Sequence, residues 1–408
     1  MRAYERLLDY VKVHTTSSEE SGTHPSFIGE FNLAKALCGE LIKLGLLKVR
    51  MDEHAYVYGM LPATDGCEEA VKLGFIAHMD TSPDASGENV KPVLHENYDG
   101  GDVILAGTGD VMSPKNFPFL NTMKGETLIT TDGTTLLGAD DKAGVAEIMT
   151  MLETIITKKL PHGELWVAFT PDEEIGEGTD FFDLEGFGAD YAYTVDGGDV
   201  YCLEYENFNA ASAKLQFKGF SVHPGTAKDT MINAAKVAME FNSMLPADET
   251  PERTEGHEGF YHLTDMSGDV TEAKLAYIIR DHDMEKFEAK KANIKAIADR
   301  INEKYGEGTV TVTLRDSYYN MLEKIKPHMH LVDNARKAIE AIGLKAEVVP
   351  VRGGTDGARL SYEGLPCPNL GTGGYNYHGT FECITAEGMD RAVAVILGII
   401  DIYAKQGK

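Results

Sequence analysis

The sequence is poor in cysteine, and none of its cysteines forms a CxxC pair. The five positions are far apart in the chain: Cys38, Cys67, Cys202, Cys367 and Cys383. An odd and scattered set favours free thiols in a reducing compartment over a disulfide framework.

The sequence also lacks a long apolar run and a signal peptide. Its longest apolar stretch, AVAVILGII near the C-terminus, is too short to cross a bilayer. The first residues, MRAYERLLDYVKVHTTSSEE, are amphipathic and charged throughout, unlike a secretory signal. We therefore expect a cytoplasmic protein with no membrane partner.

Basic residues are scarce relative to acidic ones. The chain has 38 Lys+Arg against 65 Asp+Glu, which gives a net charge of −27. Such a chain repels nucleic acid, and no basic stripe is present, so a nucleic-acid partner is not expected. The length of 408 residues exceeds one ordinary core and predicts two domains.

The first half of the chain alternates amphipathic and apolar segments. Helical periodicity covers residues 2–13, 27–44 and 142–157, and short apolar runs at 71–78, 164–170 and 190–195 are typical of buried strands. This alternation predicts an α/β domain with a mostly parallel sheet.

From about residue 207 the pattern changes to strand, helix, two strands, a long charged helix and a closing strand. This βαββαβ order is typical of a smaller α+β domain. The α/β pattern resumes after about residue 318 and ends in a helix at 387–404. We therefore predict a catalytic domain formed by residues 1–206 and 318–408, with residues 207–317 inserted into it.

Metal-binding residue types follow the strand-like segments in succession. They are His78, Asp140, Glu174 and Asp196, and a fifth candidate, His378, lies in a glycine-rich loop. Ligands of open α/β sheets bind beyond the carboxyl ends of the strands. Imidazole and carboxylate together are the donors that Zn²⁺ accepts, with Mn²⁺ and Co²⁺ as possible substitutes. The pattern predicts a metal site.

Three acids have particular positions in this pattern. Asp140 precedes a helix, whose dipole favours its ionised form, and its two oxygens could bridge two ions. Asp80 shares a strand face with His78 and could orient that ring. Glu173 is free to act as general base and acid if its neighbour Glu174 binds metal.

The other histidines that we considered occupy no such position and are interpreted as ordinary surface or structural residues. They are His14, His24, His54, His95, His162, His257, His262, His328 and His330.

Five motifs together resemble the metal-site blocks of the M20 family of dinuclear zinc exopeptidases. They are "AHMDT", "GADDKAG", "TPDEEIGEG", "TVDGG" and "GGYNYHG", in that order along the chain. The match extends over the whole chain and includes "GFSVHPG" in the inserted region, which the resemblance makes a lid and dimerisation domain. The long blocks starting at residues 130 and 352 are most similar to the family's tripeptide aminopeptidases.

The resemblance implies roles for individual residues. Asp140 would bridge two Zn²⁺ ions, His78 and Asp196 would complete one site, and Glu174 and His378 would complete the other. Asp80 and Glu173 would be catalytic, and the Asp140–Asp141 peptide would be cis.

Four further residues would bind substrate by the same resemblance. His223 would reach the partner's active site in a homodimer and stabilise the oxyanion, and Arg280 would hold the peptide's C-terminal carboxylate. Arg352 and Asn376 are weaker candidates for substrate contacts. The implied activity is release of the N-terminal residue from tripeptides by a metal-activated water.

Two alternatives stay open at this point. The same metal centre would serve a dipeptidase, a carboxypeptidase or an N-acyl amino-acid deacylase. The second alternative is a non-catalytic metal-binding scaffold. The presence of Glu173 and of all five ligand positions argues against it.

Overall fold

The computed structural model describes residues 1–406, which form two compact units. Of the described residues, unit 1 comprises 1–205, 323–349 and 355–406, and unit 2 comprises 206–322 and 350–354. Residues 318–322 and 350–354 were predicted to lie in the larger domain, but they cluster with unit 2. The backbone N–H groups of Asn320 and Met321 donate to the side chains of Asn209 and Asn207. Val351 pairs with Asn207, and the Arg352 side chain hydrogen-bonds to the chain at residues 254–258.

Unit 1 contains a mixed sheet of eight strands within the described residues, in the order β1-β2-β8-β3-β9-β16-β10-β15. The four strands β8, β3, β9 and β16 are parallel to one another. The pairs β1–β2, β2–β8 and β16–β10 are antiparallel. The strands are Leu47–Met51 (β1), Val57–Leu61 (β2), Leu73–His78 (β3), Leu165–Thr170 (β8), Tyr191–Gly197 (β9), Cys202–Glu204 (β10), Glu347–Val348 (β15) and Asn369–Gly371 (β16).

The central strands β3 and β8 are apolar up to their last residues, His78 and Thr170. All residues of β3 and β8 are buried. A parallel sheet with two covered faces requires such continuous apolar runs. The predicted α/β fold class is confirmed.

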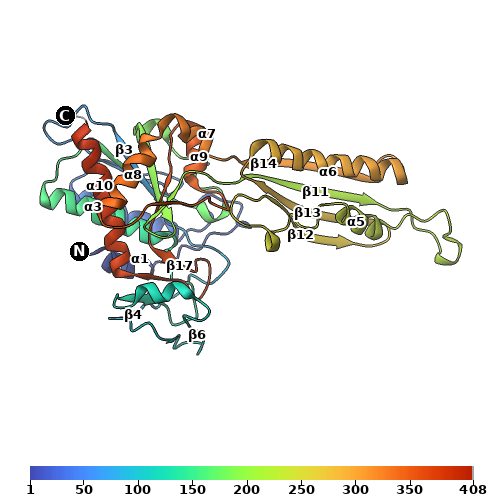
Figure 1. The fold of residues 1–408 in the computed structure, drawn as a ribbon, viewed down its shortest axis with the longest axis horizontal. Helices are drawn as coiled ribbons and strands as arrows, with labels where there is room; N and C mark the ends of the chain where they lie inside the picture. Colours follow the sequence, from blue (N-terminus) through green and yellow to red (C-terminus); the bar gives the residue numbers. More distant parts are fainter. Residues whose placement is uncertain (407–408) are drawn as a thin grey trace. The chain divides into compact units, whose positions relative to one another are not determined.

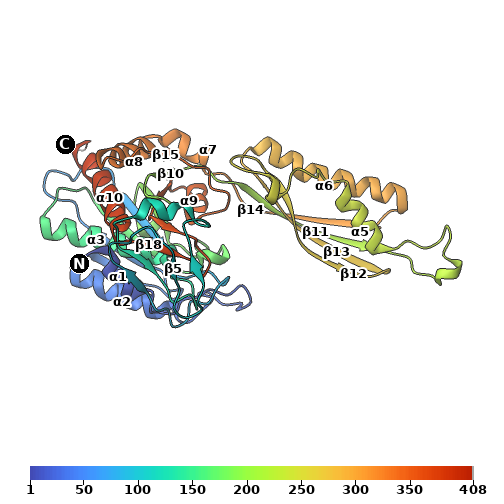
Figure 2. The same cartoon turned by 60° about the horizontal axis from the view of Figure 1, so that its bottom comes forward.

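Helices of unit 1 pack around this sheet and against one another. Helix α3 lies against β3 and β9, and α10 packs against α1, α3 and α8 (Figure 2). The helices are Ala3–Tyr10 (α1), Glu30–Leu44 (α2), Ala139–Lys158 (α3), Leu184–Phe187 (α4), Leu322–Ile325 (α7), His330–Ala341 (α8), Asp356–Glu363 (α9) and Ala386–Gln406 (α10). Short 3-10 turns are Pro118–Met123 (η1), Glu173–Ile175 (η2) and Lys326–His328 (η5).

A small second sheet of unit 1 was not anticipated from the sequence. Its strands are too short to produce a periodic pattern, and they have the order β17-β18-β7-β4. They are Val93–His95 (β4), Leu128–Thr130 (β7), Gly374–Tyr375 (β17) and Cys383–Thr385 (β18), and a separate hairpin joins Val103–Ile104 (β5) to Val111–Met112 (β6). This sheet holds the loop between β17 and β18, which contains His378.

Unit 2 is an antiparallel sheet in the order β12-β13-β11-β14, with α5 and α6 packed on it (Figures 1 and 2). Burial alternates along β13 and the second half of β11, because only one face of the sheet meets the helices. The elements are Asn209–Lys218 (β11), Pro224–Thr226 (η3), Ala234–Ser243 (α5), Pro251–Arg253 (η4), Phe260–Gly268 (β12), Glu272–Asp281 (β13), Met284–Tyr305 (α6) and Val310–Tyr318 (β14).

Two global expectations concern cysteines and membranes. All five cysteines lie in the described part of the chain and are free thiols. Among residues 1–406, no helix is both long enough and apolar enough to span a bilayer.

Candidate metal centre

The end of β3 brings His78 and Asp80 to the carboxyl edge of the large sheet. The His78 side chain is 2% exposed, and its Nδ1 lies 3.2 Å from both the backbone oxygen and the Oδ1 of Asp80. Asp141 anchors the strand end, since its two carboxylate oxygens accept the backbone N–H groups of His78 and Gly144 at 3.2 and 3.1 Å. The Nε2 of His78 therefore has a fixed direction.

Asp140 lies between two histidines at the start of α3. Its Oδ1 is 3.0 Å from the Nε2 of His78, and its Oδ2 is 3.2 Å from the Nε2 of His378. The backbone at Asp140 and Asp141 is non-helical, and the peptide between them is cis. One carboxylate thus presents a different oxygen to each imidazole, as a group bridging two ions would.

Glu174 lies next to His378, and Asp196 lies next to His78. An oxygen of Glu174 lies 2.9 Å from the Nε2 of His378, and Oδ1 of Asp196 lies 3.5 Å from the Nε2 of His78. Asp196 stands in β9, next to β3, so neighbouring strands deliver both residues to one edge. We call these five residues (His78, Asp140, Glu174, Asp196 and His378) the Asp140 cluster.

Left-handed backbone conformations direct two of the loops that carry this chemistry. Asn376 and His378 have φ values of 56° and 61°, and Asp172, just before Glu173, has a φ of 55°. Non-glycine residues rarely adopt this region, and those that do concentrate at functional sites. The turn places His378 opposite Asp140.

Glu173 is held next to the cluster through its backbone. The two oxygens of the Asp80 carboxylate accept the backbone N–H groups of Glu173 and Glu174 at 3.0 and 3.1 Å. Asp80 thus contacts the His78 ring on one side and fixes the loop of the two glutamates on the other.

The electrostatics of the site reflect many acids enclosed with few cations. Burial raises the pKa of Glu173 well above its usual range, and it raises the pKa of Asp196 to about 8. Hydrogen bonds with Asp140 and Glu174 raise the pKa of His378 to about 11. Burial also opposes ionisation of Asp140, but the contacts with His378 and His78 lower its pKa overall.

The donor set fits metal ions better than it fits protons alone. One group of close donor atoms includes His78, Asp140 and Glu174, and another includes His78, Asp141 and Asp196. The Oε1 atom of Glu174 is buried and has no hydrogen-bond partner. A buried carboxylate oxygen without a partner is costly, and a coordinated cation would satisfy it.

The four predicted substrate-binding residues are divided between the two units. His223, Arg280 and Arg352 lie in unit 2, and Asn376 lies in unit 1, where its side chain donates to the carbonyl of Phe381 at 3.2 Å. His223 is exposed, and its Nδ1 accepts from the backbone of Gly225 at 3.1 Å.

Arg280 and Arg352 are oriented by their own unit. Arg280 donates to the carbonyls of Ile279 and Ala211 at 3.0 and 3.3 Å. Arg352 donates to the carbonyls of Gly256 and Glu258 and to the Thr254 hydroxyl, at 2.9 to 3.0 Å. Their roles toward substrate stay predictions.

Two buried acids near the site were missed by the sequence analysis. Glu382 is 1% exposed and accepts the backbone N–H groups of Leu137, Gly138 and Asp140 at 2.7, 2.7 and 3.0 Å, so it holds the segment that presents Asp140. Asp356, at the start of α9, accepts the hydroxyl of Thr170 at 2.8 Å. An acid inside the apolar stretch "FECITA" was the available signal for Glu382.

Comparison with known proteins agrees with this geometry. Residues 205–309 match the family model of a peptidase dimerisation domain. Peptidase T of Clostridium novyi (strain NT) is 56% identical over 402 residues, which cover 98% of both chains. Peptidase T of Caldanaerobacter subterraneus subsp. tengcongensis is 53% identical over 408 residues, the full length of both. The crystal structure of a tripeptidase from Staphylococcus aureus has a TM-score of 0.80 and 25% identity, and covers 99% of this chain and 98% of that one.

The two-unit fold, the clustered ligand types and the dimerisation-domain match define a peptide hydrolase of the M20 class. Relatives above one half identity extend over essentially all 408 residues. The chain belongs to the peptidase T family.

Proposed function

We propose that the protein removes the N-terminal residue from tripeptides. The observation that carries this proposal is the position of Asp140, whose two oxygens face His78 and His378 separately. The full-length similarity to peptidase T supports the choice of an aminopeptidase over other hydrolases with such a centre.

Two Zn²⁺ ions per chain would be held by the Asp140 cluster. Asp140 would contribute to both, with His78 and Asp196 on one side and Glu174 and His378 on the other. When bound, the ions polarise the scissile carbonyl and make water a stronger nucleophile at neutral pH. Mn²⁺ and Co²⁺ have compatible donor preferences and could replace zinc.

Glu173 is the group that moves the proton. It takes a proton from the attacking water at a carboxylate oxygen and later delivers it to the nitrogen of the leaving peptide. Burial raises the pKa of Glu173, which suits a group that must hold a proton between these two steps. Asp80 keeps that carboxylate in place, because it fixes the backbone N–H groups of residues 173 and 174.

Recognition of both peptide ends would restrict the enzyme to short substrates. Arg280 would bind the C-terminal carboxylate, since a guanidinium pairs well with two carboxylate oxygens. His223 would act on the active site of the partner subunit and stabilise the oxyanion, which requires a homodimer. The match of residues 205–309 to a dimerisation domain supports that assembly.

Mass spectrometry of the products tests the proposal. The zinc-loaded protein is incubated with a free tripeptide, its N-acetyl form and its C-terminal amide. Loss of one N-terminal residue from the free peptide alone is the expected result. Release of the C-terminal residue or of the acetyl group would instead establish a carboxypeptidase or a deacylase. Absence of cleavage with metal bound would contradict an enzymatic role.

A further inference from the structure

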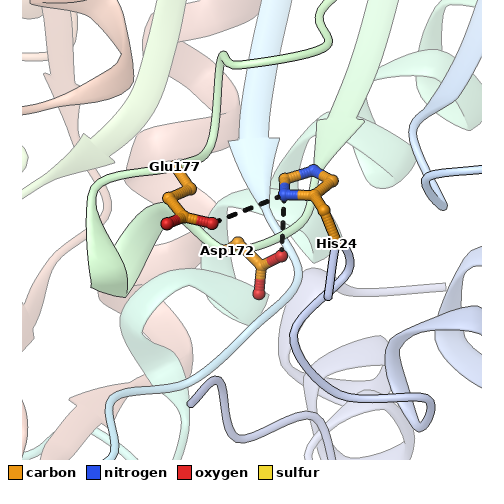
Figure 3. Close-up of side chains that lie close together, drawn as sticks. All are labelled: His24, Asp172 and Glu177. Carbon is orange, nitrogen blue, oxygen red and sulfur yellow. Dashed lines mark ion pairs between the residues drawn. The ribbon is translucent and has the colours of Figure 1, made fainter. Parts of the chain in front are cut away.

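A second cluster of metal-ligand side chains lies outside the Asp140 cluster. It consists of His24, before α2, with Asp172 and Glu177, which flank the turn η2 (Figure 3). The Nδ1 of His24 is 3.1 Å from Oδ2 of Asp172 and 3.8 Å from Oε2 of Glu177. We call these three residues the His24 cluster. Within residues 1–406, none of the three side chains forms a hydrogen bond or ion pair with the Asp140 cluster.

Two atoms of the His24 cluster are buried without a hydrogen-bond partner. The His24 side chain is 7% exposed and that of Asp172 is fully buried. Neither Nδ1 of His24 nor Oδ1 of Asp172 makes a hydrogen bond. In Figure 3 the Nδ1 edge of the His24 ring faces both carboxylates. Buried polar atoms nearly always form hydrogen bonds. A histidine nitrogen that forms none, but lies 3.1 and 3.8 Å from two carboxylate oxygens, indicates a place for a cation between them.

The His24 ring is held so that this nitrogen can act as a ligand. Its Nε2 lies 3.2 Å from the hydroxyl of Tyr56, and the ring stacks on Tyr56 and contacts Phe181. With the Nε2–H donating to Tyr56, the Nδ1 lone pair is directed at Asp172 and Glu177. Metal-bound histidines commonly have such a fixed outer nitrogen.

The two carboxylates of the His24 cluster are also placed where they could bind an ion. Oδ2 of Asp172 accepts the backbone N–H of Ser26 at 2.7 Å, which sets its direction. The Glu177 side chain is 49% exposed, so it can move onto an ion and leaves a position open to water. Ligands at tetrahedral positions around Zn²⁺ lie about 3.4 Å apart, close to the separations observed here.

No basic side chain of the described residues neutralises these two acids. Apart from His24, neither Asp172 nor Glu177 has an ion-pair partner among residues 1–406. Arg359 is near the loop, but it pairs with Asp180 and donates to the carbonyl of Gly176. A divalent cation between the His24 ring and the two carboxylates would supply the positive charge that no basic side chain provides.

We infer that His24, Asp172 and Glu177 form a further metal site, which binds one divalent cation of the zinc type with water in its remaining position. The ion joins residues 24–26 to the loop that carries Glu173 and Glu174. Because Asp172 immediately precedes Glu173, this site steadies the loop without contacting the substrate.

Zinc stoichiometry tests the inference. The wild-type chain is dialysed to equilibrium against Zn²⁺, and bound zinc is counted per chain by elemental analysis. Glu177→Lys places an ammonium group in the site and is expected to lower the count by one. Glu185→Lys is the matched control, since it makes the same charge change at an exposed position nearby and is expected to leave the count unchanged. His24→Gln provides a second variant with the same expected loss.

The difference between variants separates this site from the Asp140 cluster. A wild-type count of three falling to two supports both sites, and a count of one falling to zero supports only the His24 cluster. Equal counts for the wild type, Glu177→Lys and His24→Gln would overturn the inference, whatever the activity of the enzyme.

Discussion

The two units of this chain differ in the kind of side chain that they bury: mainly apolar side chains in unit 2, and a group of acids in unit 1. In unit 2, Phe241 of α5 and Phe287 of α6 pack with Phe217 of β11 in an apolar core on one face of the sheet. In unit 1 the edge of the central sheet encloses acids: Asp80, Asp141, Asp172 and Glu382 are all buried. Buried acids must be stabilised by hydrogen bonds or by cations, whereas an apolar core needs neither, so the same substitution type should have different consequences in the two units.

The strongest test of this comparison removes the proposed proton carrier of unit 1, Glu173. Glu173→Gln keeps the shape of the side chain but cannot accept the proton of water. We expect kcat to fall roughly 10²–10⁴-fold, the usual contribution of a general base. Steady-state kinetics on a free tripeptide measure the effect, with Glu185→Gln as the control. Retention of activity would remove Glu173 from the mechanism.

An equally local change in unit 2 should act on stability alone. Phe287 is completely buried in the core of unit 2, so Phe287→Ala leaves a cavity and is expected to cost about 3–5 kcal/mol of unfolding free energy. Denaturant unfolding measures the loss, and Met284→Ala, at a position 39% exposed, is the control. Zinc affinity of the folded protein should not change. A large change in zinc affinity would show that the units are energetically coupled.

Glu382 provides a smaller test inside unit 1. Glu382→Gln replaces one acceptor oxygen by an N–H₂ group that must face backbone donors of residues 137–140. The misplaced Asp140 should weaken zinc binding about 10–100-fold, as is typical when groups that orient metal ligands are lost. Zinc titration against a competing chelator measures it. The exposed Glu96→Gln is the control, and an equal affinity for both variants would contradict the positioning role.

The smallest expected effect is a pH dependence in unit 2. Burial lowers the pKa of His282 to about 4, from an unfolded value of about 6.5. The folded state therefore binds fewer protons, and the stabilising contribution is complete above about pH 6.5 and is lost as the pH falls toward about 4. We expect a loss of about 1–2 kcal/mol after allowance for partial exposure to solvent. Urea unfolding at both ends of this range measures it. In His282→Gln this part of the pH dependence should disappear, and identical profiles would contradict the assignment.

Much of the fold follows from local patterns that the sequence states directly. The sequence predicts strands at residues 209–219 and 272–281, and β11 and β13 of unit 2 form there. The apolar runs at 71–78 and 164–170 predict strands buried on both faces. The small sheet of β4, β7, β17 and β18 could not be predicted, because strands of two or three residues have no period to read.

Some residues of the candidate site could also be predicted from the sequence, and others could not. His78, Asp140, Glu174 and Asp196 could be selected because each follows a strand-like run, and the structure brings them together with His378. Their roles as ligands stay predictions. Glu382 was not predicted as a site residue, because its hydrogen-bond partners are backbone N–H groups, and these have no characteristic residue type in the sequence. His24 was interpreted as an ordinary residue, since the acids beside it lie about 150 positions further along the chain.

The sequence by itself determined the α/β class, the membership of the peptidase family and the residue types at the strand ends. Periodicity and motif order carry that information because they depend on near neighbours. Only the tertiary structure decided which oxygen of Asp140 faces which histidine, which buried acids fix the backbone, and that His24 meets Asp172 and Glu177. Those contacts join segments distant in sequence, and burial gives them their strength, because a charge removed from water must find its partner within the fold.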